Sequence, residues 1–158
     1  MSEKPRYGEG LIGAVSAGVF FLIIGGIFLV TPNLFDRVIA FFSNFAMVQV
    51  PNTQIIYLPA PATPFLHRTV YIAAAQFALI WGFFQIFVLI LRFTLSSPYG
   101  KKTETIGDII CNFGAYYLIS TILIPVSSLA QWFGFWALIL MLIGFSLIVR
   151  AVILAFRK

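Results

Sequence analysis

Residues 109–149 read IICNFGAYYLISTILIPVSSLAQWFGFWALILMLIGFSLIV and contain no Asp, Glu, Lys or Arg. A helix that crosses the hydrocarbon core of a membrane takes about 20 apolar residues, so this stretch is long enough for two crossings. Near its centre stands Pro125, followed by Ser127 and Ser128. Proline breaks a helix and serine favours turns. The sequence therefore predicts two transmembrane helices, near residues 105–124 and 129–156, joined by a tight turn.

Two shorter stretches without charge lie closer to the N-terminus, at residues 10–35 and 69–91. Each has room for one crossing. They predict transmembrane helices near residues 10–31 and 67–93. The predicted fold class is therefore an all-α integral membrane protein, a four-transmembrane-helix bundle that forms a single membrane domain over residues 1–158.

The composition of the chain supports this class. Hydrophobic residues make up 61% of it, charged residues make up 9%, and the mean hydropathy is +1.01. Soluble domains carry about 25% charged residues, so too little polar surface exists to cover a water-soluble globule. A soluble enzyme, a disordered chain and a disulfide-rich secreted domain are excluded. The single cysteine, Cys111, cannot form an intrachain disulfide.

The net charge of +5 predicts an orientation rather than a nucleic-acid partner. Basic residues are retained on the cytoplasmic side of membrane proteins. With the N-terminus inside, only Arg37 and Arg68 would lie outside. The basic residues that would then be cytoplasmic are Lys4, Arg6, Arg92, Lys101, Lys102, Arg150, Arg157 and Lys158. We therefore predict a multi-pass protein of the cell membrane with both termini in the cytoplasm. The length of the first apolar stretch favours a retained anchor over a cleaved signal peptide.

The extracytoplasmic segment, residues 32–66, is the longest part outside the predicted spans. Apolar residues dominate one side of its first half, through Ala46, which predicts an amphipathic helix lying along the outer membrane surface. Thr31 is expected to cap this helix, with Pro32 at its first position.

A small β-ribbon is predicted after this helix. The β-prone runs 48–50 and 54–58 flank a turn at Pro51-Asn52-Thr53. A lone ribbon of two strands is marginally stable in water, so it would need to pack against another element. The alternative that residues 38–58 cross the membrane is rejected, because the polar groups around Asn52 would be unsatisfied in lipid.

Small residues recur at helical spacing and predict close helix packing. The clearest stripe is Ala74, Ala78 and Gly82 in the second span. Further stripes are Ala14, Gly18 and Gly25 in the first span, and Gly134, Ala137, Met141, Gly144 and Ala151 in the fourth. We expect these faces to pack within the bundle. Contacts with another protein or a second copy are the alternative.

Polar residues inside the spans are the candidates for function, because they are costly there. Asp108 and Asn112 lie on one face of the third span, and Gln85 lies in the second. Arg92 and Arg150 are expected at the same depth as Asp108 and are its predicted ion-pair partners. A structural anchor is the favoured interpretation, and a relay for protons or cations at Asp108 is the alternative.

Catalytic and metal sites are not predicted. His67 and Cys111, the only histidine and cysteine, are expected near opposite sides of the membrane. One His and one Cys do not supply the usual ligand set of a zinc site, and no cofactor is expected.

The predicted function is that of a non-catalytic membrane subunit or scaffold in a larger assembly. Its expected partners are membrane lipids and other membrane subunits or further copies of the chain. The alternative is an oligomeric channel or small transporter that uses the face of Asp108 and Asn112.

Overall fold

The computed structural model describes residues 4–125 and 128–156. It contains four long helices, α1 (Lys4–Val30), α3 (Arg68–Thr94), α4 (Tyr99–Leu118) and α5 (Leu129–Ala155). The segments Gly8–Val30, Pro64–Thr94, Tyr99–Leu123 and Leu129–Ala155 are each long and apolar enough to span a membrane. This confirms the four predicted helices. Val126 and Ser127 of the predicted break, and the basic residues Arg157 and Lys158, lie outside the described residues.

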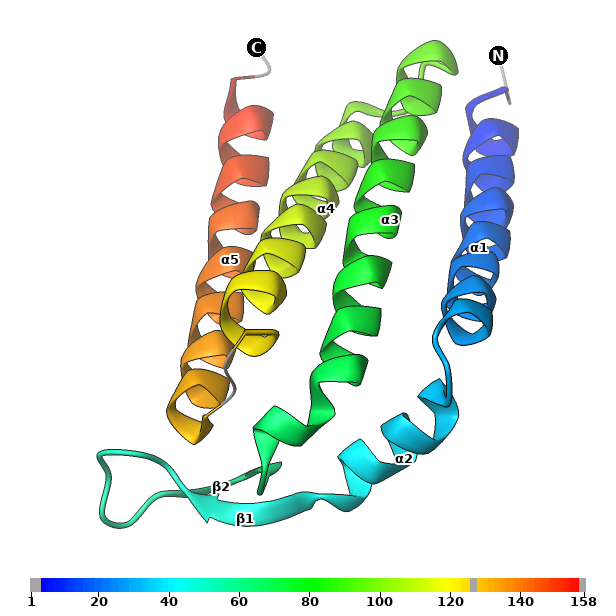
Figure 1. The fold of residues 1–158 in the computed structure, drawn as a ribbon. Coiled ribbons are helices and arrows are strands. Elements are labelled where there is room, and N and C mark those ends of the chain that lie inside the picture. Colours follow the sequence, from blue (N-terminus) through cyan, green and yellow to red (C-terminus); the bar gives the residue numbers. More distant parts are fainter. Residues whose placement is uncertain (1–3, 126–127, 157–158) are drawn as a thin grey trace.

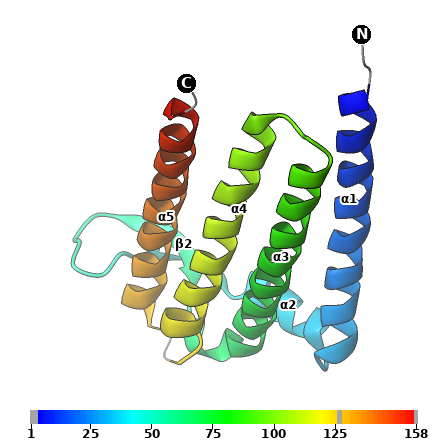
Figure 2. The same ribbon diagram turned by 90° about the horizontal axis from the view of Figure 1, so that it is seen from above.

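The four helices stand side by side in the spatial order α1, α3, α4, α5 (Figures 1 and 2). The most extensive helix contacts are those of α3 with α4 and of α4 with α5, while α1 packs on α3. The bundle is therefore open, with α1 and α5 as edge helices on opposite sides. Both chain ends lie at one end of the bundle, here called the termini end, and the β-ribbon lies at the other, the ribbon end (Figure 1).

Helix α4 begins at Tyr99, earlier than the prediction of residue 105. Pro98 precedes the first helical residue, so the helix starts as soon as the proline has been passed. Lys101 and Glu104 form an ion pair within the first turns, at a Nζ–Oε2 distance of 2.8 Å. Such i,i+3 pairs stabilise a helix, and residues 99–104, which precede the predicted start, are helical.

The last turn of this span is a π-helix, η2 (Ile119–Leu123), that continues directly from α4. The amide of Ile124 donates to the carbonyl of Ile119 at 3.1 Å, which is the i,i+5 pattern of a π-helix. Ile119 and Leu123 are both buried. The span therefore ends close to its predicted boundary at residue 124.

The predicted amphipathic helix is present as α2 (Leu34–Ser43) at the ribbon end. Its N-cap is Asn33, which adopts a left-handed conformation (φ 54°), so the expected cap at Thr31 is wrong. Asn tolerates this conformation better than most residues. Leu34 is buried, while Phe35 and Phe42 are exposed.

The predicted β-ribbon is also confirmed, with strands β1 (Phe45–Gln49) and β2 (Tyr57–Pro61) paired antiparallel. Its register joins Phe45 to Pro61 and Gln49 to Tyr57. The strands are displaced from the predicted runs 48–50 and 54–58, since β1 begins earlier, at Phe45, and β2 continues to Pro61. A short 3₁₀ helix, η1 (Pro64–His67), then leads into α3.

The buried core lies at the ribbon end, where the ribbon packs on the long helices. Ala60 of β2 is fully buried in a cluster with Tyr71, Leu123, Trp132 and further apolar residues. The hydroxyl of Tyr71 donates to the carbonyl of Pro64 at 3.0 Å. This packing supplies the support that a two-stranded ribbon needs.

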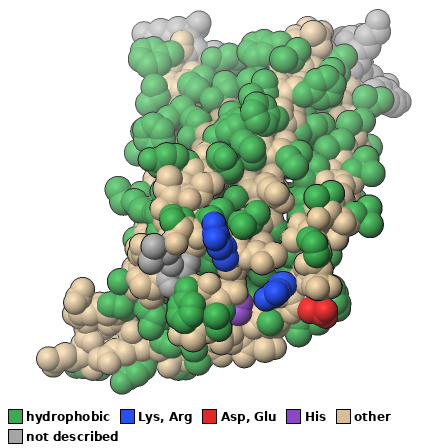
Figure 3. All heavy atoms as spheres, in the orientation of Figure 1, with side chains coloured by type: hydrophobic (Ala, Val, Ile, Leu, Met, Phe, Trp, Pro, Cys, Tyr) green, Lys and Arg blue, Asp and Glu red, His purple; other side chains and the backbone are tan. Residues whose placement is uncertain are grey.

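Hydrophobic side chains cover most of the face drawn in Figure 3, and the visible charged side chains lie in its lower part, toward the ribbon end. Many of the large apolar residues on the long helices are exposed, for example Phe21 and Leu140 at 70% each. A surface of this kind suits contact with lipid or with other apolar helices.

Candidate functional site

A polar cavity of about 500 Å³ lies at the termini end, between α1, α3 and α4. Its polar lining residues are Glu9, Ser16, Gln85, Arg92, Lys101, Glu104 and Asp108. Three of the five acidic residues of the chain therefore gather at one place. The cavity brings together three of the predicted site residues, Asp108, Gln85 and Arg92.

Arg92 links three parts of the chain at this cavity. Its Nη2 lies 3.3 Å from Oε2 of Glu9 on α1. Its Nη1 donates to the backbone carbonyl of Lys101 at 2.7 Å and to the hydroxyl of Thr105. Arg92 stands in the last turn of α3, where the helix dipole favours a cation. The guanidinium therefore holds α1 and the start of α4 against the end of α3.

This ion pair is only partly hydrogen-bonded. The side chains of Arg92 and Glu9 are 14% and 22% exposed. Nε of Arg92 and Oε1 of Glu9 are buried, and neither has a hydrogen-bond partner in the part of the chain that the structure describes.

The predicted ion pair of Asp108 is not formed. Among the side chains that the structure describes, those of residues 8–125 and 128–156, no cation lies within 4.0 Å of its carboxylate. Arg92 pairs with Glu9 instead, and Arg150 lies within electrostatic range of Asp108 without contacting it. The sequence placed these groups at similar depth but did not reveal Glu9 as the nearer partner of Arg92.

Asn112 and Arg150 lie in helix seams rather than in the lining of the cavity. The side-chain amide of Asn112 donates to the backbone carbonyl of Asp108 at 2.7 Å. A Cβ added to Gly82 would lie 3.4 Å from Cβ of Asn112 and 3.2 Å from the ring of Phe113. Asn112 therefore belongs to the seam of α3 and α4.

The seam of α4 and α5 depends on two glycines that sequence reasoning missed, Gly107 and Gly114. A Cβ added to Gly107 would lie 2.5 Å from Cδ of Arg150, and one added to Gly114 would lie 2.5 Å from Leu142. Ser146 donates to the backbone carbonyl of Gly107 at 3.0 Å. Their spacing of seven residues, which keeps both on one helix face, was the available signal.

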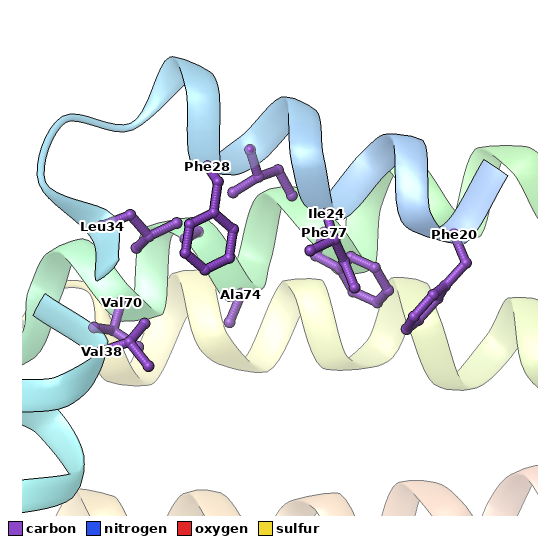
Figure 4. A pocket seen from close by; sticks show the side chains of 10 residues that line it. Phe20, Ile24, Phe28, Leu34, Val38, Val70, Ala74 and Phe77 are labelled. Carbon is purple, nitrogen blue, oxygen red and sulfur yellow. The ribbon is translucent and has the colours of Figure 1, made fainter. Parts of the chain in front are cut away.

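The predicted stripe of small residues on α3 lies partly in the bundle interior and partly in an exposed groove. Ala78 and Gly82 are buried, whereas Ala74 is exposed and lines an apolar groove of about 360 Å³ between α1, α2 and α3. Figure 4 shows this groove, with side chains of α1 such as Phe20 and Phe28 beside Ala74 and Phe77 of α3. The groove is almost entirely apolar and has the character of a lipid-facing surface.

The small residues of the two edge helices face open space. On α1, a Cβ added at Gly18 or Gly25 would meet nothing within 4 Å, and on α5 the same holds for Gly134 and Gly144. The other small residues of these stripes, Ala14, Ala137 and Ala151, are exposed. The faces that were expected to pack inside the bundle are therefore directed away from the chain's own helices.

His67 and Cys111 lie apart, but Cys111 stands at the middle of the span Tyr99–Leu123 rather than near the side opposite His67, because α4 begins earlier than predicted. His67 is buried at the ribbon end, with its ring edge-on to Phe41 at a centroid distance of 5.2 Å, and Cys111 is half-buried within α4. No group of three His, Cys, Asp or Glu side chains suited to a metal occurs among the described residues.

No protein-family model, curated protein or solved structure matches this chain.

Proposed function

We propose that this chain is a non-catalytic subunit of a larger membrane assembly, and that its edge helices α1 and α5 pack against transmembrane helices of neighbouring chains. The observation that carries this proposal is the location of four helix glycines that have space for a larger side chain. Gly18 and Gly25 on α1, and Gly134 and Gly144 on α5, have no neighbour among the described residues that requires a glycine.

The cost of glycine in a helix supports this reasoning. Each glycine is less favourable than alanine by about 1 kcal/mol in a helix interior, so a glycine without a packing role weakens its helix. Small residues allow two helix backbones to approach closely in a membrane, where no hydrophobic effect drives their association. Gly82, Gly107 and Gly114 have this role inside the chain.

The open arrangement of the helices determines which surfaces of the chain are available for contact with neighbouring chains. The two edge helices lie on opposite sides of the bundle (Figure 2). If α1 of one copy packs on α5 of the next, the contact is heterologous, and repetition of such a contact generates a ring or a filament. The same faces also fit a different membrane protein. The remaining apolar surface, including the groove of Figure 4, then contacts membrane lipids.

The mass of the protein in a mild detergent tests this proposal. The full chain, purified from its native membrane, is expected to run as a multiple of its 17.6 kDa mass or with a fixed set of other chains. Bulky substitutions on the edge helices, Gly18→Leu and Gly144→Leu, should break this species down to the single chain. A monomer without companions from unmodified protein would contradict the proposal.

A channel or small transporter is the second candidate, and one observation favours it. Asp108 and Gln85 line the polar cavity at the termini end. Asn112, the other residue of that hypothesis, lies in a helix seam. Ion flux into liposomes that contain the purified assembly, lost on Asp108→Asn with unchanged melting, would support a channel over a scaffold.

A further inference from the structure

The polar cavity at the termini end has two layers that differ in how their charges are balanced. Its outer layer holds the ion pairs of Glu9 with Arg92 and of Lys101 with Glu104. Ser16 lies seven residues beyond Glu9 along α1, and Gln85 lies seven residues before Arg92 along α3. At a rise of 1.5 Å per residue, both are about 10 Å deeper in the bundle.

The inner layer consists of Ser16, Gln85 and Asp108, which come from three different helices. In the described ranges, no hydrogen bond or ion pair engages any of these three side chains; Asn112 uses only the backbone carbonyl of Asp108. The cavity thus contains a hydroxyl oxygen, an amide oxygen and a carboxylate, all with free acceptor capacity. Arg150, the cation on the far side of α4, does not line the cavity.

Among the described charges that line the cavity, one negative charge has no direct partner. Glu9 and Glu104 each have a cation within 4.0 Å, and the remaining carboxylate is that of Asp108. A ligand that matches the inner layer therefore carries one positive charge and several hydrogen-bond donors.

We propose that this cavity binds a primary ammonium group, held by Asp108, Gln85 and Ser16. An ammonium group has one positive charge and three N–H donors, and the inner layer offers one acceptor from each of three helices. This inference goes beyond the proposed role as a subunit and does not depend on it.

Two other kinds of cation fit the cavity less well. Mg²⁺ and Ca²⁺ take six or more oxygen ligands, and the described residues contain no group of His, Cys, Asp or Glu side chains suited to hold a metal ion. A quaternary ammonium has no N–H donor and is usually held by aromatic rings. Among the side chains that the structure describes, none of those lining the cavity is aromatic.

The ammonium group has two possible sources, a soluble amine or the headgroup of phosphatidylethanolamine. The lipid is compatible with the place of the cavity near one end of the helices. Its phosphate would then meet Lys101, which is exposed at the mouth. The chemistry at Asp108 is the same for both sources, and the experiment separates them.

The soluble source is tested by melting the full chain in detergent with ethanolamine and, in parallel, with tetramethylammonium. A ligand that binds the folded state raises its stability, so ethanolamine at saturation should raise the melting temperature by about 2–4 °C or more. Tetramethylammonium at the same concentration should leave it unchanged.

The lipid source is tested in nanodiscs of phosphatidylethanolamine and phosphatidylglycerol, compared with nanodiscs of phosphatidylcholine and phosphatidylglycerol. If the lipid is the ligand, melting should be higher in the first composition, and native mass spectrometry should show retained phosphatidylethanolamine. A response to ethanolamine alone identifies a soluble amine, and a response to the lipid alone identifies the headgroup.

Two variants of α3 provide a matched pair. Gln85→Leu removes an acceptor of the inner layer, whereas Gln76→Leu changes an exposed glutamine outside the cavity. The response to the ammonium ligand should fall at least several-fold in Gln85→Leu and in Asp108→Asn, and should persist in Gln76→Leu. If Asp108→Asn does not fold, the comparison of Gln85→Leu with Gln76→Leu tests the proposal by itself. Absence of any response in the unmodified protein, or an equal response in Gln85→Leu and Gln76→Leu, would overturn the proposal.

Discussion

The guanidinium of Arg92 on α3 lies 3.3 Å from the carboxylate of Glu9 on α1, across 83 positions of sequence. Helix α1 has fewer contacts with the bundle than α3 and α4 have with each other, and this pair joins the packing of Phe20 on Phe77 and Trp81 in attaching it to α3. Both side chains are largely buried, so removal of one leaves the other poorly solvated.

We therefore predict that Glu9→Ala destabilises the isolated chain. The expected cost lies between the roughly 1 kcal/mol of an exposed ion pair and the roughly 3 kcal/mol of a buried one. Thermal unfolding in detergent measures it. Lys101→Ala, which breaks the exposed pair with Glu104, is the control and should change little. Equal melting temperatures of Glu9→Ala and the unmodified protein would show that the ion pair of Glu9 with Arg92 does not stabilise the packing of α1.

The seam of α4 and α5 should be intolerant of a single methyl group at Gly107. In Gly107→Ala the new Cβ would stand 2.5–2.9 Å from Arg150 and Ser146, and overpacking of this kind costs about 1–3 kcal/mol. Gly18→Ala on α1 is the matched control, because nothing lies within 4 Å of its Cβ. In the dissociated single chain Gly18→Ala should be neutral or stabilising by up to about 1 kcal/mol. A higher melting temperature for Gly107→Ala than for Gly18→Ala would contradict the tight packing of α4 and α5 at Gly107.

The core at the ribbon end makes a separate prediction. Tyr71→Phe removes the buried hydrogen bond that the tyrosine hydroxyl donates to the carbonyl of Pro64. We expect a loss of about 1 kcal/mol in the free energy of unfolding. Tyr57→Phe changes an exposed tyrosine of β2 and should stay within about 0.5 kcal/mol of the unmodified protein. Chemical unfolding of both variants, side by side, gives the comparison.

The orientation in the membrane is tested by labelling single cysteines in a Cys111→Ala background. Gln54→Cys, exposed in the ribbon connection, should react with an impermeant maleimide in intact cells, and Gly100→Cys at the termini end should not. Gln54 is preferred to Asn52, whose φ of 64° would be strained in cysteine. Labelling of Gly100→Cys alone would reverse the predicted orientation.

Much of the fold could be predicted from sequence because it depends on the hydropathy of continuous stretches and on the residues of local turns. The lengths of the stretches without charge set the four helices, and the turn at Pro51-Asn52-Thr53 between β-prone runs indicated the ribbon. The boundaries that differed, at Thr31 and Tyr99, depend on the conformation of one or two turn residues. Hydropathy does not indicate that Asn33 is left-handed or that α4 begins directly after Pro98.

The candidate site was less predictable, because its geometry depends on long-range contacts. Asp108, Gln85 and Arg92 could be selected as polar residues in apolar spans, but the choice of Glu9 by Arg92 requires the placement of α1. The glycines pose the same problem. Gly114, which packs tightly, and Gly18, which faces open space, look alike in sequence.

The central claim is that the glycine-bearing faces of α1 and α5 contact other transmembrane helices. Phe21 lies beside Gly18 and Gly25 at i,i+3 and i,i+4 spacing, and Met141 lies beside Ala137 and Gly144; both are exposed. Phe87, exposed on the inner helix α3, is the matched control.

Benzoylphenylalanine at each of these three positions, irradiated in native membranes, tests this claim most directly. Protein adducts above 17.6 kDa are expected from positions 21 and 141, and few are expected from position 87. No protein adduct from positions 21 and 141, or an equal yield from position 87, would contradict it.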